Sequence, residues 1–246
     1  MFQSIHQLRT RSLNLVDGRD PARYLHVSNN YKTGASVNVA IAGSCNPTRA
    51  CKKYCYGLDG PIARDNSIGR QLDNLRVLQF LELAEQREVD TVGLVLISDI
   101  DRLQRSWIRW HGVGDLLPGT VRLIHFMVNE RPDLVHWVVT RKPIEAKKLP
   151  DHPSVRVLCS FDETTPPSTA EKMYGLRKQF RKARVRFAWV RRNEEKVPRR
   201  IDIVFHEHHG RRTLELKKPD RRTCSATLPH ALHRDACDSC QRCFAP

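Results

Sequence analysis

The fold prediction rests on Ser36-Val-Asn-Val-Ala-Ile-Ala42, which is followed closely by Cys45-Asn-Pro-Thr-Arg-Ala-Cys51-Lys-Lys-Tyr-Cys55. The first stretch alternates its apolar residues and is rich in β-branched side chains, so it predicts a strand. The second places three cysteines in the loop that follows this strand. In parallel α/β folds the carboxyl ends of the strands carry ligands and chemistry. Together the two stretches predict an α/β protein with a functional cysteine loop after its first strand.

Strands and helices are predicted to alternate after this loop. Leucines across 67–86 repeat with the period of an amphipathic helix. The nearly continuous apolar run Thr91-Val-Gly-Leu-Val-Leu-Ile-Ser98 predicts a strand that is buried on both faces. A helix is predicted over 106–117, and 121–127 fits either a strand or part of a helical hairpin.

The second half of the chain continues this alternation. Strands are predicted over 136–140, 155–161, 185–190, 201–205 and 212–216, and helices over 144–149 and 170–183. Such alternation implies parallel pairing through right-handed crossovers. About six of these units favour a partial or complete (β/α) barrel. No Gly-x-Gly-x-x-Gly follows a strand, which disfavours a dinucleotide-binding sheet.

The spacing of Cys45, Cys51 and Cys55 indicates a metal centre. Three thiolates in one short loop can converge on one inorganic core, and they leave one coordination position open. The basic residues between and beside the cysteines are expected to lower the pKa of the thiols. We favour an iron–sulfur cluster here. A zinc site completed by His26 or His125, and unligated cysteines, remain alternatives.

A second group of cysteines closes the chain, with the spacing Cys224-x12-Cys237-x2-Cys240-x2-Cys243. The consecutive Cys-x2-Cys-x2-Cys is similar to the run that wraps an iron–sulfur cubane, whereas structural zinc usually uses two separated pairs. A second [4Fe–4S] cluster is therefore favoured over zinc, and disulfides are a third reading. The remaining Cys159 falls in a predicted strand and is expected to be a buried core thiol.

These features divide the chain into three predicted parts. Residues 1–35 form an N-terminal arm, 36–218 form the α/β barrel, and 219–246 form a cysteine-rich metal-binding cap. No run of about 18 apolar residues occurs, so no membrane span is expected. The start lacks the pattern of a secretory signal, so a cytoplasmic location is expected. Clustered cysteines in such a compartment indicate metal or catalysis before disulfides.

The charge of the chain points to a polyanionic partner. Lys and Arg outnumber Asp and Glu by 42 to 27, which gives a formal net charge of +15. Such a field attracts nucleic acid. The cations gather after residue 172, as in the run 177–184, which is predicted to lie on one helix. Trp107 and Trp110 could stack on bases, whereas Trp137 and Trp189 fall in strands and are expected in the core.

His206-Glu-His-His209 has the composition of a metal-ligand cluster. It falls at a predicted hairpin turn, where exposed polar residues are expected. An exposed turn is therefore favoured over a metal site.

The ordered motifs of the chain resemble a known family. A three-cysteine loop with Tyr56 after its last cysteine looks like the cluster loop of radical S-adenosylmethionine (SAM) enzymes, whose commonest spacing is C-x3-C-x2-C. The closer resemblance is to the uncharacterised, phage-associated gene product 88 family. That resemblance is carried by Cys55-Tyr56, Ser98-Asp99-Ile100-Asp101, Thr140-Arg141-Lys142-Pro143 and the C-terminal cysteines.

This resemblance implies a barrel of the radical-SAM type. In such barrels three cysteines hold a [4Fe–4S] cluster, here Cys45, Cys51 and Cys55, and an electron from the cluster cleaves SAM to a 5′-deoxyadenosyl radical. The usual Gly-Gly-Glu after the second strand is absent, and the resemblance puts Ser98, Asp99 and Asp101 in its place. Their alternative role is to cap the helix that follows. Tyr56, Thr140 and Arg141 are expected to line the cofactor site.

The expected function is therefore that of a radical-SAM-like iron–sulfur enzyme acting on a nucleic acid or a nucleotide-containing substrate, with a protein as electron donor. A zinc-stabilised, non-catalytic nucleic-acid-binding protein is the alternative from another class. A cluster-bearing accessory protein without SAM chemistry is the third reading.

Overall fold

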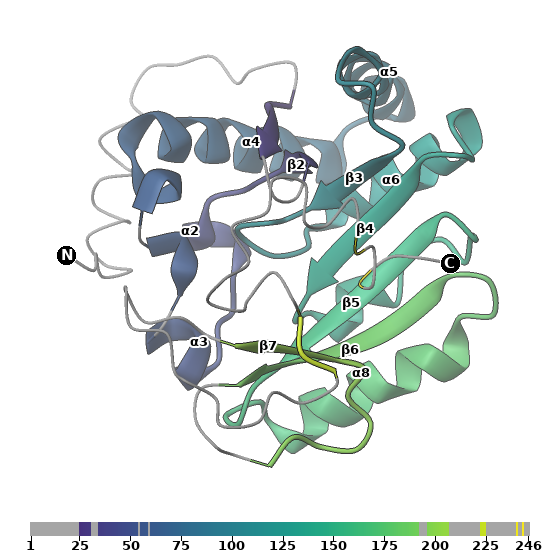
Figure 1. Ribbon diagram of the computed structural model, residues 1–246. Coiled ribbons are helices and arrows are strands. Elements are labelled where there is room, and N and C mark those ends of the chain that lie inside the picture. The colour runs from purple at the N-terminus through teal and green to yellow at the C-terminus, as the bar shows by residue number, and fades with distance from the viewer. Residues whose placement is uncertain are drawn as a thin grey trace.

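The computed structural model describes residues 25–30, 34–53, 55–58, 60–191, 196–206, 222–224, 240 and 243. Within them, seven strands form one sheet whose spatial order is the chain order. The strands are β1 (Val27–Asn30), β2 (Gly34–Val37), β3 (Trp107–Trp110), β4 (Val135–Thr140), β5 (Val155–Phe161), β6 (Arg184–Arg191) and β7 (Ile203–His206). Strands β2 to β7 pair in parallel, and β1 pairs antiparallel with β2 (Figure 1).

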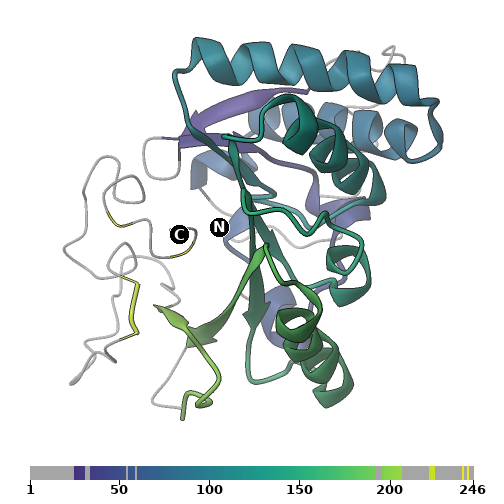
Figure 2. The ribbon, with the colours of Figure 1, turned by 90° about the vertical axis from the view of Figure 1, so that its right-hand side faces the viewer.

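Helices occupy the connections between the parallel strands. They are α2 (Ile41–Ser44), α3 (Arg49–Lys53), α4 (Asp65–Leu83), α5 (Gln86–Arg102), α6 (Pro118–Glu130), α7 (Pro143–Ala146) and α8 (Pro167–Gln179), with two short 3₁₀ turns, η1 (Tyr56–Leu58) and η2 (Gly60–Ala63). When parallel strands follow one another in chain order, crossovers of one hand place their helices on one face of the sheet. Figure 2 shows the long helices on the same side of the sheet.

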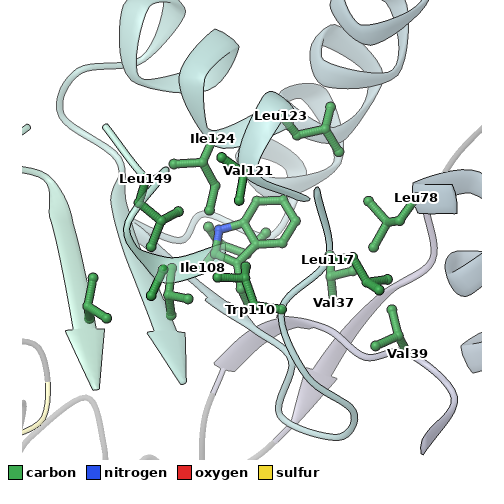
Figure 3. Packing of buried hydrophobic residues seen from close by; sticks show 14 of the residues in the cluster. Val37, Val39, Leu78, Ile108, Trp110, Leu117, Val121, Leu123, Ile124 and Leu149 are labelled. Atoms are coloured by element: carbon green, nitrogen blue, oxygen red, sulfur yellow. The ribbon is translucent and has the colours of Figure 1, made fainter. Parts of the chain in front are cut away.

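The two faces of the sheet bury different sets of residues. The face toward the helices holds the main hydrophobic cluster, where Trp110 of β3 packs with Val121 and Ile124 of α6 (Figure 3). The opposite face carries none of the helices α2 to α8, so we call it the helix-free face, and it holds a smaller cluster. Its members are Trp107, Trp137, Leu158, Ala188 and Ile203, together with Cys224 and Cys243. Trp107, Trp110 and Trp137 are all buried, so the first two are core residues rather than stacking platforms.

The α/β prediction is confirmed in its parallel sheet and in most of its elements. The predicted strand over 155–161 coincides with β5, and β4, β6, β7, α4 and α8 lie close to their predicted ranges. The sheet has two ends, β1 and β7, and among the described residues no pairing joins them into a closed barrel. Residues 1–24, the predicted strand 212–216 and most of the predicted cap lie outside the described residues.

The first half of the chain contains three predictions that differ from the structure. The strand predicted over 36–42 ends at Val37 in β2, and Ile41–Ser44 is the short helix α2. The run 91–98 is not a strand but the middle of α5, and 106–117 contains β3 rather than a helix. In α5 the buried residues Val89, Val92, Leu96 and Ile100 recur every three or four positions, whereas Leu94 between them is 54% exposed. Apolar residues on both sides of this helix imitate the uniform pattern of a buried strand. The undecided stretch 121–127 is part of α6.

The close approach of α4 and α6 yields a test of the fold. A Cβ atom at Gly119 of α6 would lie 2.0 Å from the backbone oxygen of Leu78 in α4. Gly119→Ala is therefore expected to lower the free energy of unfolding by about 1–3 kcal/mol, because the two helices must move apart. Gly175→Ala in α8 is the control, since nothing lies within 4 Å of its Cβ position. There alanine should stabilise by about 0.5–1 kcal/mol. Equal effects of the two variants in urea unfolding would contradict this packing.

Candidate functional site

Polar side chains from four successive connections gather at the carboxyl edge of the sheet. The cysteine loop follows β2, Asp115 follows β3, Arg141 follows β4 and Asp162 follows β5. Because parallel strands end at the same edge, these loops are neighbours although the chain separates them widely. Hydrogen bonds connect all four, and we call this set the carboxyl-edge site.

Asp162 accepts the hydrogen bonds that hold the cysteine loop in place. Its side chain is fully buried, and Oδ2 lies 2.6 Å from a guanidinium nitrogen of Arg141. The same Oδ2 accepts a hydrogen bond from the hydroxyl of Thr48 at 2.5 Å, and Oδ1 accepts one from the hydroxyl of Thr164 at 2.8 Å. Thr48 also accepts a hydrogen bond from the backbone N–H of Cys51 at 3.1 Å. The cysteine loop is thereby tied to the ends of β4 and β5.

The surroundings of Asp162 favour the ionised form of its carboxyl group. Burial alone would raise the pKa of Asp162, but the charge of Arg141 and the hydrogen bonds from Thr48 and Thr164 outweigh burial. The pKa of Asp162 is consequently held below its ordinary value. A carboxylate that is both charged and buried is stabilised only while these partners remain in place.

Asp115 is a second buried carboxylate, and it joins the ends of β3 and β4. Its Oδ1 accepts hydrogen bonds from the hydroxyl of Thr140 at 2.6 Å and from the backbone N–H of Leu116 at 2.7 Å. The backbone N–H of Arg141 lies 3.3 Å from both carboxylate oxygens. Burial raises the pKa of Asp115, while these hydrogen bonds and the charge of Lys142 oppose the rise. The backbone N–H of Asp115 donates to Ser44 Oγ at 3.3 Å, which brings this carboxylate beside the cysteine loop.

The three cysteines of the loop influence one another electrostatically. The pKa of Cys45 is raised to about 12, mainly by burial and in addition by the charges of Asp115, Cys55 and Cys51. Only the hydroxyl of Ser44, 3.8 Å from the sulfur, acts to lower it. The expectation that the neighbouring basic residues lower the thiol pKa is therefore wrong for Cys45. Its thiol stays protonated at neutral pH unless a cation replaces the proton.

The three thiols of the loop are the donor type that a thiophilic metal prefers. Thiolates select iron–sulfur clusters, zinc and copper(I). Within the described ranges, no group of three His, Cys, Asp or Glu side chains could hold a metal ion as it stands. The two histidines considered as a fourth ligand make other contacts. His26 Nε2 lies 3.3 Å from Asp73, and His125 Nε2 lies 2.9 Å from the backbone oxygen of Lys148.

Ser98, Asp99 and Asp101 lie elsewhere in the fold. The prediction placed them after the second strand, but they belong to the last turns of α5, which precedes β3. They are therefore at the amino ends of the strands, the edge opposite the cysteine loop. Asp99 pairs with Arg102 of its own helix, and Asp101 pairs with Arg131. Tyr56 lies in η1 directly after Cys55, and its side chain is outside the described part.

Sequence reasoning missed several members of the site. Asp162 directly follows the predicted strand 155–161, and this position was a usable signal for it. Asp115 was hidden because 106–117 had the appearance of a helix. His111, at the end of β3, has a φ of +57° and is buried. Its Nε2 lies 2.9 Å from the hydroxyl of Thr120, and burial lowers its pKa to about 3. A non-glycine residue in the left-handed region is uncommon and frequently marks a functional loop.

The cysteines outside this loop belong to other elements of the fold. Cys159 is fully buried in β5, as predicted, and burial raises its pKa to about 12. Cys224 and Cys243 are buried in the cluster on the helix-free face, and Cys240 is exposed. Cys237 and the segment 207–209 of the histidine cluster lie outside the described residues.

The protonated state of Cys45 can be tested by alkylation. Only the thiolate reacts rapidly with iodoacetamide. In metal-free protein at pH 7.5, Cys45 is expected to react far more slowly than the exposed Cys240, because its pKa is about 12. Peptide mass spectrometry of a time course measures both rates. Modification of Cys45 at the rate of Cys240 would show that its thiol is neither buried nor beside a negative charge.

Comparisons with known proteins give one match. A family model described as "Gene product 88" matches residues 11–246 of the chain. No curated protein and no solved structure matches it. Among the described residues, no helix is both long and apolar enough to cross a membrane.

Proposed function

Since the chain belongs to the gene product 88 family, we propose that it is an iron–sulfur protein with a radical-SAM-like active site at the carboxyl edge of its sheet. The observation that carries the proposal is the loop of Cys45, Cys51 and Cys55, whose thiols are close enough for two of them to raise the pKa of the third. The order of the parallel strands supports a partial barrel, because such a barrel also follows chain order with its helices on one face.

The proposed cofactor is a [4Fe–4S] cluster on these three cysteines, and with SAM bound it would supply the one-electron chemistry of this enzyme class. The protein's own contribution is to hold the cysteine loop in a conformation that can receive the metal. Cys45 is half-buried, and a thiol with a pKa of about 12 binds metal only by releasing its proton. Metal uptake should therefore become more favourable as the pH rises.

Two residues predicted to contact SAM act in this proposal as positioning residues. Thr140 donates its hydroxyl hydrogen to Asp115, and Arg141 directs its guanidinium toward Asp162. Both side chains thus hold the loops of the site in place. The role proposed for Ser98, Asp99 and Asp101 loses its structural basis, because these residues lie at the opposite edge of the sheet.

The remaining parts of the proposal come from composition and from the second group of cysteines. A net charge of +15 supports a nucleic acid or a nucleotide-containing molecule as the substrate. Cys224, Cys237, Cys240 and Cys243 would hold a second [4Fe–4S] cluster or zinc, and its binding would help fold the end of the chain. A protein electron donor would reduce the first cluster, and a cytoplasmic location fits the reduced thiols that both sites require.

Anaerobic purification followed by iron, sulfide and zinc analysis tests the proposal. Replacing Cys45, Cys51 and Cys55 together with serine should remove about four irons per chain, the content of one cubane. Cys159→Ala is the matched control and should retain all of them. Addition of SAM should shift the EPR spectrum of the reduced wild-type protein. Stoichiometric zinc without iron would overturn the proposal.

One alternative function is favoured by a specific observation. Cys224 and Cys243 are buried in a hydrophobic cluster, as the ligands of a structural metal are, and the chain is strongly basic. A zinc-stabilised nucleic-acid-binding protein would share these features, and zinc in both cysteine groups would identify it. Iron without a SAM-dependent EPR change would instead identify a cluster-bearing accessory protein.

A further inference from the structure

Exposed cations accompany the cysteine loop at the carboxyl edge of the sheet. Helix α3 lies within this loop and carries Arg49, Lys52 and Lys53. Positions three and four residues apart lie on the same face of a helix, so these cations share one face. All three are exposed, whereas Ala50 of the same helix is buried, and Arg64 directly before α4 is exposed as well. The loop therefore turns a positively charged surface toward solvent.

Three of these cations have no compensating group. Among the residues that the structure describes, the side chains of Arg49, Lys52 and Arg64 form no hydrogen bond or ion pair. Lys53 does interact with another group and is therefore not counted with them. We call Arg49, Lys52 and Arg64 the basic rim. Because the rim is both exposed and unpaired, its charge is available to an anion from outside the chain.

Charge is unevenly distributed between the two edges of the sheet. The twenty residues 45–64 contain four cations and one acidic residue, Asp59. The twenty residues 82–101, which run to the last turns of α5, contain six acidic residues and one cation, Arg87. Figure 1 shows α3 at the lower left and α5 at the upper right, on opposite sides of the molecule. A polyanion that approaches the protein is consequently drawn toward the carboxyl edge.

Hydrogen bonds hold α3, and with it two residues of the rim, in place. The backbone N–H of Ala50 donates to Thr164 Oγ1 at 2.9 Å, and that of Cys51 donates to Thr48 Oγ1 at 3.1 Å. Both threonine hydroxyls are in turn bonded to the buried carboxylate of Asp162. A ligand that binds to a preorganised segment loses less free energy to ordering of the protein.

We propose that the basic rim binds the phosphate groups of a nucleic acid strand and so holds the strand over the cysteine loop. Contacts of Lys and Arg with phosphates supply most of the affinity for nucleic acid and fix the position of the strand without reading its sequence. Because the rim flanks the cysteines, a strand bound there lies beside the proposed metal centre. This inference rests on the nucleic-acid part of the proposed function and not on the identity of the metal.

The basic run 177–184 offers a second positive surface and a matched control. It was predicted to present its cations along one helix, but α8 ends at Gln179 and Arg184 lies in β6. Lys178 and Lys182 are exposed, and they lie where α8 leads into β6, at the amino edge of the sheet. Replacing both lysines removes the same charge at the edge opposite the cysteine loop.

The test compares Lys52→Gln/Arg64→Gln with Lys178→Gln/Lys182→Gln. Fluorescence anisotropy with a labelled single strand of about 12 nucleotides measures Kd over a range of salt concentrations. The rim variant should weaken binding at least about 10-fold and reduce the salt slope by about 1.4, since each phosphate contact to a single strand contributes about 0.7. The control variant should change Kd less than about 3-fold. Equal losses in the two variants, or an unchanged Kd in the rim variant, would overturn the proposal.

Alkylation locates the bound strand on the molecule. In metal-free protein, a saturating strand should slow the reaction of Cys55 with iodoacetamide at least about 3-fold, because the strand covers the loop and its charge disfavours the thiolate. Cys240, which is exposed and outside the loop, should react at an unchanged rate. Equal slowing at both cysteines, or none at Cys55, would place the strand elsewhere and overturn the proposal.

A charge-conserving variant and metal analysis complete the experiment. Lys52→Arg/Arg64→Lys keeps both charges and should bind within about 3-fold of the wild type, and circular dichroism checks that all variants are folded. Iron content is measured on the same samples. If the protein holds no iron but only the rim variant loses binding, the metal centre fails and this inference stands. If the wild type binds no strand, the nucleic-acid part of the proposed function fails together with this inference.

Discussion

Asp162→Ala is expected to lower the free energy of unfolding by about 3–5 kcal/mol, the usual cost of removing one partner from a buried ion pair. The variant leaves Arg141, whose side chain is only 15% exposed, without its carboxylate. It also removes the acceptor for the hydroxyls of Thr48 and Thr164. Urea unfolding monitored by circular dichroism measures the loss.

The same variant should loosen the cysteine loop, because Thr48 links Asp162 to the backbone of Cys51. Metal content per folded chain is expected to fall along with stability. Asp133→Ala is the control, since Asp133 pairs with Arg131 at the surface and its side chain is 66% exposed. That change should cost no more than about 1 kcal/mol. Similar costs for the two variants would mean that the pair between Arg141 and Asp162 is not buried in solution.

The contribution of Asp162 also has a definite pH dependence. Its pKa is lower in the folded protein than its ordinary value of 3.8. The folded state therefore prefers the charged form, and the resulting stabilisation is complete above the unfolded-state pKa. It is lost as the pH falls through the lower, folded-state pKa. Wild type and Asp162→Ala should consequently differ most at neutral pH and least in strong acid.

Asp115→Ala is expected to lower the free energy of unfolding by roughly 3 kcal/mol, because it leaves buried donors without an acceptor. These donors are the hydroxyl of Thr140 and the backbone N–H groups of Leu116 and Arg141. The loops after β3 and β4 would lose their common anchor. Thermal unfolding should show a lower Tm, and an unchanged Tm would contradict the anchoring role of this carboxylate.

Asp115→Asn separates the charge of this residue from its shape. The charge of Asp115 raises the pKa of Cys45, and asparagine removes this effect while filling the same space. Alkylation of Cys45 in metal-free protein should then become faster than in the wild type at the same pH. Cys240, which is exposed, serves as the internal control. An unchanged rate at Cys45 would show that Asp115 is already protonated in the wild type.

The parts of the fold that were predictable are those with a local cause. The strand predicted over 155–161 is mostly apolar and is bounded by turn residues, and β5 has the same bounds. The leucine repeat that predicted a helix over 67–86 reflects the single buried face of α4. Cys159 was predicted to be a core thiol because it falls in a strand, where a free thiol packs as a small apolar side chain, and it is fully buried. Each of these patterns is set by residues a few positions apart.

The errors arose where apolar residues on the exposed side of a helix concealed the helical period of its buried residues. Helix α5 exposes Leu94 and Val95 while burying Val92 and Leu96, so apolar residues occur without a break. That misreading placed Ser98 at the end of a strand and obscured Asp115, which follows the true second parallel strand. A short stretch of sequence does not show which face of a helix packs against another helix or the sheet.

By itself, the sequence determined the α/β class, the cysteine loop after the first parallel strand, and the membership of the chain in its family. Only the tertiary structure decided which residues surround that loop. Thr48 and Asp162 are separated by 114 residues, yet one hydrogen bond joins them. Asp115 and Thr140 meet only because β3 and β4 pair in parallel and end at the same edge. Propensity and period act over a few residues, whereas a site at a sheet edge depends on strand order and register, which the packing of the whole chain sets.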